Sequence, residues 1–122
     1  MSGDRQPFLY APIRACLRGP RNDPRTVAVL VVPTPKGAPV VARMPLPADG
    51  RGDAVARARE QIIREAHDRA AAREADPEEL VRWWMARASQ RADFVWLERP
   101  MAGSAVSLEA EAEGILAEYV AP

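Results

Sequence analysis

Nine of the chain's twelve prolines lie between Pro7 and Pro47, and this distribution limits the possible folds more than any other feature. Proline removes a backbone donor and biases the residue before it toward extended conformations, so the first third of the chain cannot form a long helix. Short β-prone runs stand between the prolines, at residues 8–17, 26–32 and 40–44. We therefore predict three strands in this part of the chain.

Turn-forming residues separate these runs. Residues 18–25 (RGPRNDPR) and 33–39 (PTPKGAP) gather Gly, Pro, Asn and Asp, which favour turns. Short connections of this kind predict an antiparallel meander. The run TVAVLVV at residues 26–32 is apolar on both faces, which predicts a central strand covered by helices on at least one side.

The pattern becomes helical after residue 52. From Asp53, a plausible N-cap, to about Glu74 the chain contains no proline. One helical stripe in this segment is apolar and consists of Val55, Ala58, Ile62, Ala66 and Ala70. Glu60 and Glu65 each precede an arginine by four residues, a spacing that favours ion pairs with Arg64 and Arg69. We predict one long amphipathic helix.

A second helix is predicted to begin at the sequence DPEE. Asp76 can cap it, Pro77 suits the first helical position and Glu79 completes a capping box. Leu80, Trp83, Trp84 and Arg87 mark its faces, and we expect it to end near Arg91.

The last part of the chain predicts one strand and one helix. Residues 93–98 (DFVWLE) have large apolar side chains on both sides, so Trp96 is expected in the core of a fourth strand. We interpret residues 99–106 as a loop and Ser107 as the cap of a final helix. The expected buried stripe of that helix contains Leu108, Ala112, Ile115, Leu116 and Tyr119.

These elements predict one α+β domain spanning residues 1–122. It comprises a small antiparallel sheet of about four strands packed by three helices, in the order β-β-β-α-α-β-α. An apolar fraction of 48% over 122 residues is sufficient for a real core. The single cysteine, Cys16, excludes an internal disulfide, and neither a secretory signal nor an apolar run long enough for a membrane span occurs in the sequence. A cytoplasmic location is the expectation.

The element order resembles a family of short bacterial proteins, the domain of unknown function 3037. The likeness is carried by YAPIRACLRGPRNDPRTVAVLVV, FVWLERP and SLEAEAEGILAEYV. The family has an Asn-Val-Gly element in its second strand, where this chain has Val27, Ala28 and Val29. Members are often encoded beside HipA-like kinases, so the resemblance implies an accessory or regulatory role without established chemistry.

The best functional cluster in the sequence is a set of arginines around the first turn: Arg14, Arg18, Arg21 and Arg25. Residues 1–52 hold eight basic against three acidic side chains and residues 53–122 hold nine against fourteen, so the basic excess lies in the first half. Guanidinium groups here could bind phosphates or an acidic protein surface, or could simply be solvated. A net charge of zero argues against nucleic acid as the main partner.

Adjacent Trp83 and Trp84 form the second candidate contact. Successive residues point about 100° apart on a helix, so we expect one indole in the core and the other at the periphery. The peripheral ring is either an interface anchor or packed under the helix edge.

Recognisable catalytic chemistry is missing from the sequence. His67 is the only histidine, Cys16 stands in an apolar run, and no glycine-rich nucleotide motif occurs. We therefore expect no metal site and no cofactor. The leading hypothesis is a non-enzymatic interaction or regulatory protein of bacterial or phage origin that binds a protein partner. The alternatives are a nucleic-acid-associated accessory protein that uses the arginines, and a small enzyme of unrecognised type.

Overall fold

The computed structural model describes residues 5–16, 24–34, 40–44, 53–71, 77–90 and 95–120. Five strands and three helices follow one another along these residues. The elements are β1 (Gln6–Cys16), β2 (Pro24–Pro33), β3 (Val41–Arg43), α1 (Asp53–Ala71), α2 (Pro77–Ala88), β4 (Val95–Leu97), β5 (Met101–Ala105) and α3 (Leu108–Val120). The predicted α+β class and the antiparallel sheet packed by three helices are confirmed.

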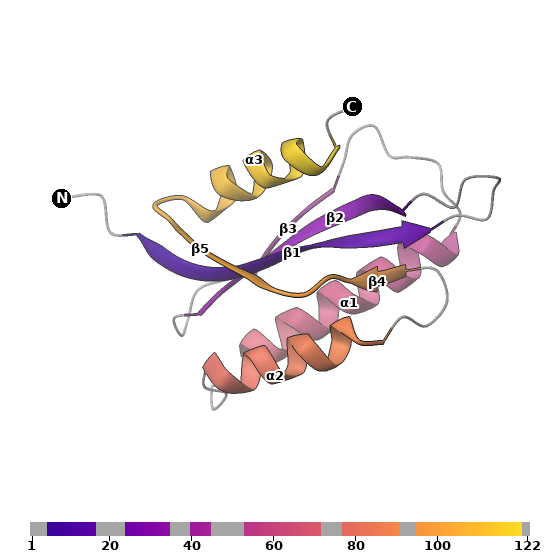
Figure 1. The fold of residues 1–122 in the computed structure, drawn as a ribbon, viewed down its shortest axis with the longest axis horizontal. Helices are drawn as coiled ribbons and strands as arrows, with labels where there is room; N and C mark the ends of the chain where they lie inside the picture. Colours follow the sequence, from indigo (N-terminus) through magenta and orange to yellow (C-terminus); the bar gives the residue numbers. More distant parts are fainter. Residues whose placement is uncertain are drawn as a thin grey trace.

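The sheet is antiparallel throughout, with the order β3-β2-β1-β4 and with β5 also paired to β1 (Figure 1). The predicted meander is therefore confirmed, and β2 lies at its centre between β3 and β1. Figure 1 shows α3 on one face of the sheet and α1 with α2 on the other. The prediction that helices cover the central strand on at least one side is confirmed, because both faces are covered.

The interpretation of residues 99–106 as a loop is wrong, because Met101–Ala105 form β5. Strand β1 is eleven residues long and β4 only three, so β4 alone cannot pair the whole edge of β1. Strand β5 pairs with the remainder, from Gln6 opposite Ala105 to Tyr10 opposite Met101. The edge of β1 is thus occupied along nearly its whole length.

Proline at position 12 explains why this edge strand is interrupted. The Glu98 N–H donates to the Pro12 carbonyl over 3.1 Å, but Pro12 has no N–H to return to the Glu98 carbonyl. The Trp84 Nε1–H donates to that carbonyl instead, over 3.0 Å. A side chain of α2 therefore supplies the hydrogen bond that the strand cannot make.

A bulge in β2 changes which face its first residues present. Ile13 lies opposite Ala28 but Arg14 lies opposite Thr26, so Val27 is an extra residue in the ladder. The Arg59 guanidinium of α1 donates from Nη1 to the Val27 carbonyl over 3.3 Å. Helix α1 thus satisfies a carbonyl at the irregular position in the ladder.

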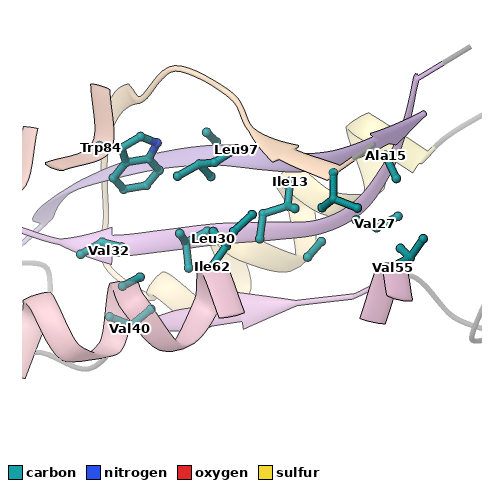
Figure 2. Close-up of a cluster of buried hydrophobic side chains, with 14 of the residues drawn as sticks. Ile13, Ala15, Val27, Leu30, Val32, Val40, Val55, Ile62, Trp84 and Leu97 are labelled. Atoms are coloured by element: carbon teal, nitrogen blue, oxygen red, sulfur yellow. The ribbon is translucent and has the colours of Figure 1, made fainter. Parts of the chain in front are cut away.

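Two hydrophobic clusters lie on opposite faces of the sheet. The first, shown in Figure 2, joins odd-numbered β1 residues such as Ile13 to Ile62 of α1 and to Trp84 of α2. The second joins Phe8 to α3, through Leu108, Ala112, Ile115 and Leu116. The helical stripes predicted from the sequence are the buried ones.

The predicted fourth strand and final helix are present, although β4 covers only Val95–Leu97 of the expected residues 93–98 and residues 93–94 lie outside the described part of the chain. Trp96 is 7% exposed, and its neighbours Val95 and Leu97 are buried on the other face of the sheet. The Ser107 Oγ accepts a hydrogen bond from the Ala110 N–H over 3.2 Å, so Ser107 caps α3 as expected. Helix α2 ends at Ala88, three residues before the expected end. The predicted cap Asp76 and the expected end of the first helix near Glu74 lie outside the described residues.

Across the described ranges, none of the helices combines the length and the apolar character needed to cross a membrane.

Candidate functional site

The two adjacent tryptophans of α2 occupy different environments. Trp84 is fully buried under β4 and Trp83 is half-buried, so the prediction of one core and one peripheral indole is confirmed. Their ring centroids lie 6.0 Å apart, nearly edge to face. Because Trp84 has no surface to offer, only Trp83 of this pair is a candidate partner contact.

Trp83 lines an open hollow that it shares with residues of α1. The hollow has a volume of about 340 Å³ and is lined by Glu65, Asp68, Arg69 and Trp83. Three of these residues come from the last turns of α1 and one from α2. We refer to it as the Trp83 hollow.

Of the charged side chains that line the Trp83 hollow, Glu65 is paired with a residue of α2 and the others have no such partner among the described residues. Arg87 Nε lies 3.2 Å from Glu65 Oε1, and Arg87 Nη1 donates to Gln90 Oε1 over 3.1 Å. The predicted pairing of Glu65 with Arg69 on the same helix is therefore replaced by a pairing between helices. Within the part of the chain that the structure describes, Asp68 and Arg69 form no ion pair with each other or with another residue.

This combination of groups suits a cationic side chain from another molecule. An indole face attracts a positive charge, and the attraction increases as water is excluded. The Asp68 carboxylate at the same opening can pair with that charge, whereas Glu65 is already neutralised by Arg87. The Arg69 guanidinium lines the same opening and can pair with a carboxylate of the same partner. The Trp83 hollow can thus hold an arginine or lysine by its hydrocarbon stem and its charged end.

The arginine cluster does not form one surface patch in the described part of the chain. Arg18 and Arg21 lie outside the described residues. Arg14 lies opposite Thr26, and Arg25 lies opposite Ala15, which packs against α1 and α2. Neighbouring strand residues point to opposite faces, so Arg14 points to the α3 face and Arg25 to the other. Without the bulge at Val27, Arg14 and Arg25 would both point to the same face of the sheet.

Arg14 belongs to a polar group at the edge of the α3 face. Its Nε lies 4.0 Å from Glu98 Oε1, the same oxygen that accepts a hydrogen bond from Trp96 Nε1 over 3.0 Å. Nearby, burial and the neighbouring Tyr10 raise the pKa of Tyr119, Arg14 opposes this rise, and Glu118 and Glu98 add to it. Arg14 is therefore engaged with a carboxylate of its own chain.

Two further residues singled out by the sequence are His67 and Cys16. His67 is exposed on α1. Cys16 is the last residue of β1, and its side chain lies outside the described part of the structure. Among the described residues, no group of three His, Cys, Asp or Glu side chains could hold a metal ion.

The sequence identified Trp83 but not the residues around it. Glu65 and Arg69 were visible as a helical pair, and Asp68 had no distinguishing signal. Only the orientation of α2 beside α1 reveals that these residues share an opening with Trp83. Comparisons of the chain with protein-family models, with curated proteins and with solved structures found no match.

Proposed function

We propose that this chain is a non-enzymatic, cytoplasmic interaction protein that regulates or assists a protein partner by binding it at the Trp83 hollow. The observation that carries the proposal is the half-buried indole of Trp83 at an opening it shares with the Asp68 carboxylate, which pairs with no cation among the described residues. The partner contributes a lysine or arginine side chain to this opening.

The position of Trp83 favours binding over mere packing. Its ring is held nearly edge to face against the fully buried Trp84, so little conformational freedom is lost when a partner covers it. Tryptophan is enriched among the residues that dominate interface energies, especially where a partner excludes water from it. The Glu65–Arg87 pair beside it links α2 to α1. Trp83 therefore offers a preorganised anchor.

The arginine cluster supports the nucleic-acid alternative less well. A phosphate backbone is bound by several cations on one surface. Of the two cluster arginines that the structure describes, Arg14 lies near Glu98 on the α3 face of the sheet. Arg25 points to the face that α1 and α2 cover. We therefore place the partner contact on α1 and α2.

The proposal is tested in two stages. The partner is first identified by chemical cross-linking in the native cell and is then purified, and its affinity for each variant is measured by titration calorimetry. We expect Trp83→Ala to weaken binding by roughly thirtyfold or more, as for an interface residue worth at least about 2 kcal/mol. Trp83→Phe should retain part of the affinity, because an aromatic face remains.

Two further variants separate the charge contribution from the aromatic one. Asp68→Asn should weaken binding several-fold at low salt and much less at high salt, because exposed charge pairs are screened. Arg82→Ala changes an exposed residue of the same helix outside the hollow and serves as the matched control. Unchanged affinity in Trp83→Ala, with an unchanged far-UV circular dichroism spectrum, would refute the proposal.

A further inference from the structure

The outer edge of β5 directs backbone groups away from β1, and no other strand of the described residues pairs with them. The Thr34 N–H donates to the Pro7 carbonyl over 3.1 Å, so residue 7 directs its backbone toward the β2 side of β1. Its partner in β5, Ser104, therefore directs its own N–H and C=O away from β1, as does Ala102 two residues earlier. Among the described residues, β5 pairs only with β1.

The residues of β5 themselves supply little protection to this free edge, and a protecting charge comes from Arg5. Natural edge strands carry charges, prolines or bulges that prevent pairing with another chain. Strand β5 reads MAGSA and has neither a charge nor a proline. Arg5 covers part of it, with Nη2 donating to the Ser104 carbonyl over 2.8 Å and Nε to the Ser104 Oγ over 3.2 Å. Both bonds are exposed and can be exchanged for others at little cost.

Exposed apolar side chains accompany the unpaired backbone. Met101 is 38% exposed at the start of β5, and Val106 is 56% exposed just after its end. On α2, Val81 and Met85 are exposed on the flank opposite to the one that carries Trp83. Because α2 packs under β4 and its Trp83 flank faces α1, this second flank lies toward the β4–β5 edge of the sheet.

We propose that the occupant of this edge is a second copy of the same chain, paired antiparallel along β5 about a two-fold axis at Gly103. In this register Ala102 of one copy lies opposite Ser104 of the other, and each such pair exchanges two hydrogen bonds. The symmetry provides the same pair twice, so every outward N–H and C=O of Ala102 and Ser104 is satisfied. The interface is isologous and closes with two copies.

The neighbouring residues favour this register and this occupant. Shifting the axis to Ala102 would set Ser104 against Pro100, which has no N–H to donate. With the axis at Gly103, Val106 of one copy lies opposite Pro100 of the other, in the segment that joins β5 to β4, the strand on which α2 packs. That position brings the exposed Val106 toward the exposed Val81 and Met85, so apolar surface on each copy covers apolar surface on the other.

The test compares two substitutions at one position. Ser104→Pro removes an N–H that makes no bond to β1, and Ser104→Ala keeps this N–H while also losing the hydroxyl. Sedimentation equilibrium of the full chain over a wide concentration range should show a monomer–dimer equilibrium. We expect Ser104→Pro to raise the dimer dissociation constant at least about tenfold relative to Ser104→Ala, since two donors are lost per dimer. Arg5→Ala should strengthen the dimer by releasing the Ser104 carbonyl.

Amide hydrogen exchange keeps the proposal testable if Ser104→Pro perturbs the fold. In the unaltered chain, exchange at Ala102 and Ser104 should slow as protein concentration rises, because both amides point outward in the monomer. A chain that stays monomeric throughout the range would overturn the proposal. So would a dimer in which these two amides exchange at a rate independent of concentration.

Discussion

The hydrogen bond from Trp84 to the Glu98 carbonyl predicts a specific energetic coupling between Trp84 and Pro12. Trp84→Phe removes the indole donor, and Pro12→Ala creates a backbone N–H directly opposite the same carbonyl. In the unaltered chain only the indole can complete this pair. Once position 12 has an N–H, the carbonyl keeps a donor after the indole is lost, so the two substitutions should not be additive.

The magnitude follows from what each substitution removes. Trp84 is fully buried, so its replacement by the smaller phenylalanine leaves a void of roughly 40 Å³, which costs about 1 kcal/mol, and the lost apolar contact adds about 1 kcal/mol. The lost hydrogen bond contributes about 1 kcal/mol more. We expect Trp84→Phe alone to destabilise the chain by about 3 kcal/mol, and by about 2 kcal/mol in the Pro12→Ala background.

The assay is a double-mutant cycle of urea unfolding for the four proteins. Far-UV circular dichroism is the suitable signal, because the substitution at Trp84 alters tryptophan fluorescence directly. The expected coupling is about 1 kcal/mol, above the roughly 0.3–0.5 kcal/mol within which independent sites are additive. Equal costs of Trp84→Phe in both backgrounds would show that the missing N–H of Pro12 does not explain the position of the indole.

Four further substitutions test the packing, the helix cap and the buried phenol by urea unfolding or pH titration. A Cβ at Gly103 would lie 2.8 Å from the ring of the buried Phe8, so Gly103→Ala should cost about 1–3 kcal/mol. Gly114 in α3 has open space around it, so Gly114→Ala should instead stabilise the fold by about 0.5–1 kcal/mol, and equal effects at the two glycines would contradict the packing described. Ser107→Ala should cost about 1 kcal/mol through the lost cap, and an unchanged urea midpoint would remove that assignment. Burial raises the pKa of Tyr119, so the folded state resists its ionisation and loses stability as the pH rises past the ordinary tyrosine value near 10. Tyr119→Phe should reduce this loss of folding stability at alkaline pH and remove the late phase of phenolate absorbance. An unaltered absorbance titration would contradict the raised pKa of Tyr119.

The sequence predicts best those elements that have a regular spacing of apolar residues or distinct residues at their ends. Proline and glycine mark the ends of the β1–β2 meander, and the apolar stripe containing Ile62 and Ala66 marks α1. Ser107 marks the start of α3 by its capping chemistry. In each case a local interaction decides the structure, and it can be recognised in a short window.

Strand β5 and the site depend on contacts between distant segments. The residues MAGSA contain no β-branched side chain and follow Pro100, so their strand is specified by the unpaired edge of β1 and by the space that Gly103 leaves for Phe8. Likewise, one extra residue at Val27 decides that Arg14 and Arg25 face apart. A bulge of one residue has no distinct signature in TVAVLVV, so the arginine cluster could not be resolved from the sequence.

The pairing of β1 with β4 and β5 also determines the order in which the molecule can be completed during synthesis. Ala15 pairs with Val95 and Gln6 with Ala105, so residues at both ends of β1 have partners that are translated much later. Contacts between such distant segments form slowly, because a long loop must close before they contribute. Until the residues from Val95 onward leave the ribosome, one edge of β1 is open and the indole of Trp84 lacks its carbonyl. A nascent chain at this stage has an open strand edge at which another chain can pair, so slow release of the residues from Val95 onward would prolong its exposure to aggregation.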